Sequence, residues 1–219
     1  YPSGSGNDFI KTIGGKAEDY LDLQKLVDGK TKIFDALQCG EKICCNICNI
    51  GVDSVIADRI NRYKTIPGVS GAMAYNISTA VTLIGGAFGG LAKPMKVTFD
   101  DGEIFEDRCM FSVFGNGKIY GGGYHAVPEA KPDDGLIDFC TVSEIGLLRI
   151  AKVIGIYKKG EHIHDPSLAD VLKLRRCTEA KVESSELLTV SIDGEISKTN
   201  SIEIKILPAS LSFRVPAFE

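Results

Sequence analysis

The chain has 219 residues, 44% of them hydrophobic and 25% charged, a balance typical of a globular protein rather than of a disordered or collagen-like chain. Its formal net charge of −4 argues against a nucleic acid as the main partner. The 24 glycines predict many turns or close approaches of the backbone.

The first half of the sequence mixes helical spacing with strand-like runs. The apolar stretch 72–92 contains Asn76 and several glycines, which favours a buried helix over one that spans a membrane. The Asp101-Gly102 pair predicts a hairpin turn. In chain order, the pattern predicts helical segments at 9–13, 53–63 and 72–84, and strands at 32–37, 42–50, 96–99, 104–106 and 109–114.

The second half is dominated by predicted strands. The pattern predicts a strand at 136–142, helices at 145–157 and 166–173, and further strands at 174–178, 180–184, 188–192, 196–198, 202–207 and 211–215. We find no internal repeat or low-complexity linker. The whole order predicts a mainly β fold with α insertions (α+β), in which sheets pack face to face.

The seven cysteines invite either a metal or a redox interpretation. Cys44, Cys45 and Cys48 resemble part of a zinc site, but no second pair follows at a suitable spacing. Residues 42–50 instead fit a buried strand, in which cysteine is a small apolar filler. The first eight residues carry neither the basic nor the apolar part of a signal peptide, so we expect reduced thiols and a cytosolic chain.

The first candidate site is the glycine-rich segment 2–9. Glycine, hydroxyl and amide residues ahead of a helix leave backbone N–H groups free for phosphate oxygens. Ser5 can donate to a phosphate, and Asp8 can help to hold Mg²⁺, which prefers oxygen ligands. The alternative is an ordinary turn in which Asn7 or Asp8 caps the helix.

The second candidate is the stretch from Gly121 to Leu136. Its simplest interpretation is a long loop that closes in an Asp-Gly turn. The alternative is a cation site, because the Asp134 carboxylate and backbone carbonyls two or three residues away offer oxygen ligands at a suitable reach.

The third candidate is Asp193-Gly194-Glu195, where a strand enters a hairpin turn. A carboxylate at such a tip, beside a substrate cleft, can act as a general base. Two further histidines, His162 and His164, stand one residue apart before Asp165. Because no third ligand cluster accompanies them, we expect a solvated loop there rather than a metal site.

Taken together, the segments Gly4-Ser5-Gly6-Asn7-Asp8-Phe9, Gly121-Gly122-Gly123, residues 126–138 and Asp193-Gly194-Glu195 resemble the diacylglycerol kinase catalytic-domain family in content and order. The bacterial branch, which contains diacylglycerol kinases and YegS-like lipid kinases, is the most similar. The strand at 46–51, which runs into Asp53, also resembles the entry to that family's second domain. The resemblance extends over almost the whole chain.

The resemblance implies a role for each matching residue. Gly4, Ser5, Gly6 and Asn7 would bind ATP, with Asp8 near the Mg²⁺ of the nucleotide. Glu195 would be the base that removes the proton from the lipid hydroxyl as it attacks the γ-phosphate. A structural Mg²⁺ would use Asp134 and the backbone carbonyls of Lys131 and Leu136.

The family's fold implies a nucleotide domain with a Gly-Gly-Asp-Gly-Thr phosphate loop, followed by a β-sandwich similar to that of NAD kinases. No Gly-Gly-Asp-Gly-Thr occurs in this sequence. We therefore expect a C-terminal fragment that is inactive by itself. Residues 1–28 would be a remnant of the nucleotide domain and linker, 29–210 the β-sandwich, and 211–219 a strand that returns toward the first domain.

The resemblance also implies partners and a location. The partners would be a lipid substrate at the membrane surface and the absent nucleotide domain, and the protein would be cytoplasmic with peripheral membrane contact. Loss of that domain would expose the cleft face, so a homodimer formed through this face is a further alternative. Two further functions stay open at this point. One is a kinase whose acceptor is a sphingoid base, a ceramide or NAD, and the second is a non-enzymatic β-sandwich that binds lipid or a partner.

Overall fold

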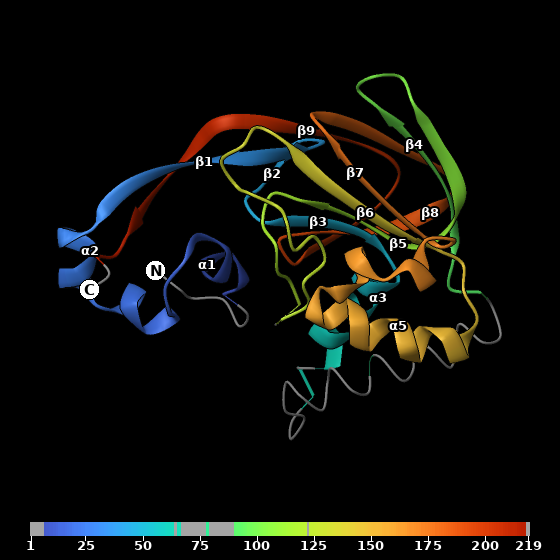
Figure 1. The fold of residues 1–219 in the computed structure, drawn as a ribbon, viewed down its shortest axis with the longest axis horizontal. Coiled ribbons are helices and arrows are strands. Elements are labelled where there is room, and N and C mark those ends of the chain that lie inside the picture. Colours follow the sequence, from blue (N-terminus) through green and yellow to red (C-terminus); the bar gives the residue numbers. More distant parts are fainter. Residues whose placement is uncertain (1–6, 64, 67–77, 79–89, 122, 218–219) are drawn as a thin grey trace.

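The structure, a computed structural model, describes residues 7–63, 65–66, 78, 90–121 and 123–217. The described part is mostly β, with helices at the N-terminal end and beside the sheet (Figure 1). In chain order, its elements are α1 (Asp8–Ile13), η1 (Ala17–Leu21), α2 (Leu23–Asp28), β1 (Lys30–Cys39), β2 (Lys42–Cys44), β3 (Ile47–Gly51), α3 (Val52–Tyr63), β4 (Lys93–Phe99), β5 (Ile104–Gly115), β6 (Ile137–Ser143), α5 (Leu147–Lys159), η2 (Glu161–His164), η3 (Pro166–Leu168), β7 (Leu172–Cys177), β8 (Glu179–Ile192) and β9 (Glu195–Val215).

These strands belong to one hydrogen-bonded sheet in the order β2-β1-β9-β8-β3-β5-β6-β7, with β4 pairing to both β5 and β8. Every pairing is antiparallel. The long strands β5 and β8 each pair with β4 along one half and with β3 along the other. The strands therefore wrap around a common interior, which confirms the predicted mainly β, sandwich-like fold.

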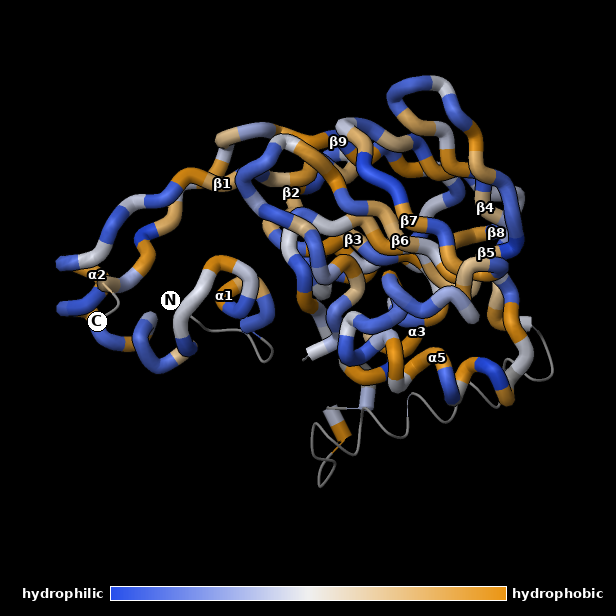
Figure 2. The backbone as a smooth tube through the Cα atoms, viewed as in Figure 1, coloured by the Kyte–Doolittle hydropathy of each residue, from blue (hydrophilic) through white to orange (hydrophobic). Residues whose placement is uncertain are grey.

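The interior is filled by apolar side chains from the strands of the sheet. Phe114 and Phe139 pack against each other there, with ring centroids 4.9 Å apart and planes tilted by 44°, and Leu37, Ile50 and Val190 lie fully buried in the same cluster. Buried and exposed residues alternate along parts of β9, where one face meets water, whereas β3 and β6 are buried almost throughout. Hydrophobic and hydrophilic stretches both occur along the strands (Figure 2).

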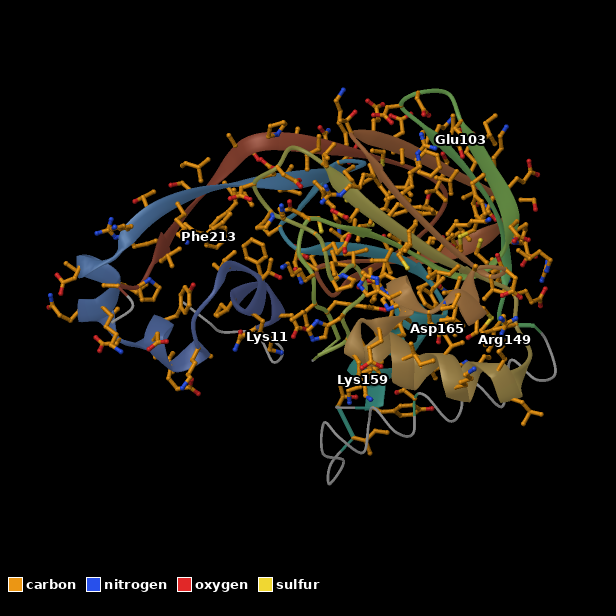
Figure 3. The ribbon with its side chains drawn as sticks, viewed as in Figure 1. Lys11, Glu103, Arg149, Lys159, Asp165 and Phe213 are labelled. Atoms are coloured by element: carbon orange, nitrogen blue, oxygen red, sulfur yellow. The ribbon has the colours of Figure 1, made fainter. Side chains whose placement is uncertain are left out.

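Strands β1 and β9 continue beyond the sandwich as a two-stranded arm, with α2 and the C-terminal end of the described chain at its tip and α1 beneath it (Figure 1). A separate apolar cluster covers the arm, formed by Ile13, Tyr20, Phe34 and Val215 together with partly buried neighbours. The Phe213 ring lies between the arm and α1 (Figure 3), 5.3 Å from the Phe9 ring. The last residues of β9 thus hold the N-terminal helices in place.

Several predicted elements require correction. Residues 42–50 form two strands, β2 and β3, rather than one. Residues 166–173 form only the short η3 before β7 begins, because Leu172 and Lys173 pair with β6. The predicted strands at 104–114 are one strand, β5, and those at 180–192 and 196–215 are β8 and β9, which continue across register shifts. The predicted helix at 72–84 lies outside the described residues, apart from residue 78.

Candidate active site

The tip of the hairpin between β8 and β9 is the centre of the site. Asp193 has a left-handed backbone (φ 49°), and its carboxylate reaches across to the turn between β2 and β3. It accepts hydrogen bonds from the backbone N–H groups of Cys45 (2.6 Å), Asn46 (3.1 Å) and Ile47 (3.0 Å). Because these N–H groups donate to Asp193 rather than to a neighbouring strand, residues 42–50 form two strands instead of one.

Glu195 follows two residues later, at the start of β9. One of its carboxylate oxygens lies 2.8 Å from Lys42 Nζ on the edge strand β2. The ion pair with Lys42 lowers the pKa of Glu195 below its ordinary value. The side chain is 74% exposed. Lys42, Asp193 and Glu195, with Ile43 and Ile192, line an open cavity of about 370 Å³.

The turn at 116–119 connects this cavity to helix α1. The N–H groups of Asn116 and Gly117 both donate to Asn46 O at 2.9 Å, and Asn46 Nδ2 donates to Ile119 O at the same distance. On the other side of the turn, Lys118 N donates to Thr12 Oγ1 in α1 at 3.0 Å. Helix α1 is therefore fixed to the turn that Asp193 holds.

Gly117 is the tightest point of this junction. A Cβ there would lie 2.0 Å from Asn46 Oδ1 and 3.1 Å from Thr12 Oγ1. Since Asn46 is held by Ile119, we expect Gly117→Ala to reduce the free energy of unfolding by about 1–3 kcal/mol, measured by urea denaturation. Gly155→Ala is the matched control, because a Cβ on this helical glycine meets nothing within 4 Å. Equal stability of the two variants would contradict the proposed crowding.

A buried aspartate connects the turn to the loop that contains Asp134. Asn116 Nδ2 donates to Asp35 O and to Cys45 O, both at 2.8 Å. The Asp35 carboxylate, itself buried, accepts from Gly135 N and Ala209 N at 2.7 Å, while Asp35 N donates to Pro132 O. The second and third candidate segments are thus joined through the interior.

The predicted metal ligand Asp134 lies at the edge of this loop. Its Oδ1 accepts from Leu136 N at 3.2 Å, and its Oδ2 lies 3.1 Å from Arg176 Nη2. Arg176 also pairs with Asp138, whose pKa is raised by burial despite that cation. Within the described ranges, no three His, Cys, Asp or Glu side chains converge on a point that could hold a metal.

A cation at Asp134 would accordingly rest on one carboxylate and on main-chain oxygens. The turn made by Leu136 N and Asp134 Oδ1 holds the carboxylate beside residues 131–136, and such hard oxygen ligands suit Mg²⁺ together with water. Both oxygens of Asp134 are already engaged, one by Leu136 N and one by Arg176, so a cation here would compete with Arg176 for the carboxylate. The Mg²⁺ ligands Asp134, Lys131 and Leu136 stay a prediction.

The predicted nucleotide-binding residues are only partly described. Gly4, Ser5 and Gly6 lie outside the described residues. Asn7 stands at the N-cap position of α1, as the alternative predicted, but its backbone is left-handed (φ 46°) and its side chain makes no capping hydrogen bond. Asp8 is the first residue of α1, and its carboxylate lies 2.6 Å from Lys11 Nζ. Its role toward a nucleotide stays a prediction.

The solvated loop expected at 162–165 also needs correction. His162 is buried, its Nε2 lies 3.0 Å from Ala126 O, and its ring packs 4.6 Å from that of Tyr157. Burial lowers its pKa. His162 thus supports the loop that follows Tyr124, whereas Asp165 accepts from Ser167 N and caps η3 at the surface.

Sequence reasoning missed Lys42, Asp35, Asn46 and Asn116. A local signal exists for two of them. Asp35 is the only charged residue between Ile33 and Leu37 in an apolar strand, and Asn116 stands before Gly117 directly after one. The partner of Lys42 comes from the other end of the sequence, so no local pattern indicates it.

The fold and this hairpin site define a β-sandwich domain with helical additions. Residues 46–215 match the family described as the YegS C-terminal NAD kinase beta sandwich-like domain, and the chain belongs to that family. This finding confirms the predicted resemblance to YegS-like lipid kinases and to an NAD kinase-like sandwich.

Similar proteins carry kinase names. The diacylglycerol kinase of Mycobacterium tuberculosis is 26% identical over 98% of this chain and 68% of its own length. A Xanthomonas euvesicatoria protein named "Probable lipid kinase YegS-like" is 24% identical over 98% of this chain and 68% of its own length. A crystal structure of a diacylglycerol kinase from Bacillus anthracis has the same fold, with a TM-score of 0.65 at 20% identity, covering 97% of this chain and 64% of that one. The chain thus spans about two thirds of the length of these relatives.

Proposed function

We propose that this chain is the larger part of a lipid kinase that transfers the γ-phosphate of ATP to a hydroxyl of diacylglycerol or a similar lipid. The observation that carries the proposal is Glu195, an accessible carboxylate at the rim of a cavity, fixed on a hairpin tip and paired with a cation. It occurs in a family whose relatives are named as diacylglycerol or lipid kinases.

In this proposal Glu195 is the general base. One of its carboxylate oxygens takes the proton from the lipid hydroxyl, the hydroxyl oxygen forms a bond to the γ-phosphorus, and the bond from that phosphorus to the β-γ bridging oxygen breaks, releasing ADP. The pairing with Lys42 lowers the pKa of Glu195, so the carboxylate is ionised at neutral pH and can take the proton as the bond to phosphorus forms, although the same pairing makes it a weaker base than an unpaired glutamate. Catalysis of phosphoryl transfer rests on positioning and charge neutralisation, and Lys42 contributes a positive charge in the same cavity.

Nucleotide binding belongs to the N-terminal segment in this proposal. Gly4, Ser5, Gly6 and Asn7 would contact ATP, and Asp8 would help to hold the Mg²⁺ that neutralises phosphate charge. The Gly-Gly-Asp-Gly-Thr phosphate loop is missing from the sequence. We therefore propose that a separate nucleotide domain supplies the loop and that the 219-residue chain alone is inactive.

The test is phosphate transfer from radiolabelled ATP to lipid in mixed micelles, with the 219-residue chain and with the longest product of the same gene. We expect turnover only when a nucleotide domain is present. Transfer by the 219-residue chain would contradict the need for that domain, and no transfer by either protein would contradict the kinase function. A panel of diacylglycerol, ceramide, a sphingoid base and NAD identifies the acceptor.

Membrane contact follows from the proposed acceptor, because diacylglycerol resides in a bilayer. Among the helices of the described residues, none has the length and apolar character needed to cross a membrane. We propose contact at the membrane surface only. Co-sedimentation with vesicles that contain diacylglycerol tests this contact.

The structural Mg²⁺ has its own test. A ligand that binds only the folded state stabilises it by mass action, so we expect saturating Mg²⁺ to raise the free energy of unfolding by about 1–3 kcal/mol. Asp134→Asn should abolish the increase, which thermal unfolding with Mg²⁺ or with EDTA measures. Asp133→Asn, which changes the neighbouring carboxylate, is the matched control. If Mg²⁺ stabilised the Asp134→Asn variant as much as the wild type, the cation would not bind at Asp134.

A further inference from the structure

Asp53, near the start of α3, belongs to a cluster of polar side chains outside the cavity that contains Glu195. Its Oδ2 accepts a hydrogen bond from Tyr120 Oη at 2.7 Å, and its Oδ1 accepts one from Ser54 N at 3.1 Å. Tyr120 Oη lies 3.4 Å from Tyr157 Oη in α5. The cluster therefore joins the start of α3, the segment that follows β5 and the end of α5.

The hydrogen-bond donors to Asp53 are neutral groups. They are the Tyr120 phenol, the Ser54 backbone N–H and the Asn49 side chain. Burial raises the pKa of Asp53 to about 6, although the hydrogen bonds from Tyr120 and Asn49 lower it. Burial also raises the pKa of both Tyr120 and Tyr157, so the two phenols stay protonated at neutral pH. Of these three titratable side chains, Asp53 is therefore the one whose charge changes close to neutral pH.

Other titratable groups face this cluster from the elements packed against it. The centres of the His162 and Tyr157 rings lie 4.6 Å apart, and burial lowers the pKa of His162. Lys158 Nζ lies 5.7 Å from the centre of the Tyr124 ring, which is 6.3 Å from that of Tyr120. An experiment must therefore separate a proton on Asp53 from one on His162. Two buried thiols also interact with the Asp53 charge, those of Cys48 in β3 and Cys140 in β6.

A short run of hydrogen bonds connects Tyr120 to the turn that Asp193 holds. The residue before Tyr120 is Ile119, whose carbonyl oxygen accepts from Asn46 Nδ2 at 2.9 Å. Asn46 N in turn donates to Asp193 Oδ1 at 3.1 Å, and Glu195 follows Asp193 by two residues. Tyr120 is thus connected through two hydrogen bonds to the carboxylate at the hairpin tip.

We propose that Asp53 and Tyr120 form a proton-sensitive link that positions the turn held by Asp193, and with it Glu195. An ionised carboxylate accepts a stronger hydrogen bond than a protonated one. When Asp53 takes a proton from water, the bond from Tyr120 therefore weakens and the neighbouring Ile119 carbonyl is less firmly held. Asp53 and Tyr120 are positioning residues in this inference, which rests on the proposed function only for the role of Glu195.

The link can be tested by NMR on the ¹⁵N-labelled 219-residue chain, titrated across neutral and mildly acidic pH. The amide signal of Ser54, which donates to Asp53, reports the charge on Asp53, and the signals of Asn46 and Ile119 report the turn. We expect all three signals to shift with one midpoint at about pH 6. Asp53→Asn should abolish the step at Asn46 and Ile119. Asp133→Asn, which neutralises an exposed carboxylate, is the matched control and should keep the step.

A second variant tests the hydrogen bond itself. Tyr120→Phe keeps the ring but removes the hydroxyl that donates to Asp53. Because that hydrogen bond lowers the pKa of Asp53, the midpoint at Ser54 should rise, whereas Asn46 and Ile119 should no longer follow it. Circular dichroism checks that both variants fold, and Tyr120→Phe remains decisive if Asp53→Asn does not.

The inference would be overturned if the Ser54 signal did not titrate, or if Asn46 and Ile119 did not follow it in the wild type. It would also be overturned by a step at the turn that persists in Asp53→Asn or in Tyr120→Phe. Persistence in Asp53→Asn would place the proton on another group, such as His162. The measurement needs neither ATP nor lipid, so an inactive protein would contradict the proposed function and leave the link intact.

Discussion

In the proposed kinase, with a nucleotide domain present, Glu195→Gln is expected to lower kcat for lipid phosphorylation by about 10²–10⁴-fold, the range ascribed to a general base. Glutamine keeps the size of the side chain and an oxygen that can accept from Lys42, but it cannot take a proton from the lipid hydroxyl. The loss should therefore fall on kcat, with the KM for ATP little changed. Steady-state kinetics with diacylglycerol in mixed micelles measures both.

Glu161→Gln is the matched control for this experiment. Glu161 is an exposed residue of η2 that pairs loosely with Lys159, 3.9 Å away, and it lies outside the cavity. We expect its kcat to equal that of the wild type. If Glu195→Gln also kept wild-type kcat while the parent protein was active, Glu195 would not be the base, and the kinase proposal would need another proton acceptor.

The largest loss of stability is expected for Asp35→Ala. Asp35 is only 4% exposed. Its two carboxylate oxygens accept hydrogen bonds from Gly135 N and Ala209 N, each at 2.7 Å. Alanine leaves both N–H groups without that acceptor. At about 1–3 kcal/mol for each unsatisfied group, the free energy of unfolding should fall by about 2–6 kcal/mol. Urea denaturation of purified protein measures the change.

Two comparisons separate the lost hydrogen bonds from a lost charge. Asp35→Asn keeps an acceptor oxygen and should cost less than Asp35→Ala. Asp28→Ala removes an exposed carboxylate that accepts from the Gln24 side chain in α2, and it should leave stability within about 0.5 kcal/mol of the wild type. If Asp35→Ala were as stable as Asp28→Ala, the anchoring of the 132–135 loop by Asp35 would be contradicted.

The sequence predicted the parts of the fold that depend on neighbouring residues. The Asp101-Gly102 pair marks the β4–β5 hairpin, and Gly14 ends α1 where expected. The break between β2 and β3 could not be predicted, because it is made by Asp193, which is about 150 residues away in the sequence. Residues 166–173 have a local helical pattern, but Leu172 and Lys173 pair with β6 instead of continuing a helix.

The candidate site shows the same division. Asp193, Glu195 and Asp134 could be found from short motifs, since each stands beside a turn glycine within a recognisable segment. Lys42 and Asp35 could not, because their importance comes from pairs across the sheet and through the interior. The family resemblance implied roles for Glu195 and Asp134, whereas contact geometry alone pointed to Lys42 and Asp35.

The arm made by β1 and β9 also affects how the protein can be made. Lys30 pairs with Val215, and Thr31 with Arg214. The outer half of β1 therefore cannot pair as a strand before the last residues of β9 have been made. During synthesis, which proceeds from the N-terminus at about 5–20 residues per second, this half has no β9 partner until residues 211–215 have left the ribosome. The turn at 45–47 also lacks its acceptor for most of the synthesis of this sequence, until Asp193 has been made. Within residues 1–219, the outer arm and the turn of the candidate active site can therefore form only after most of this sequence has been made.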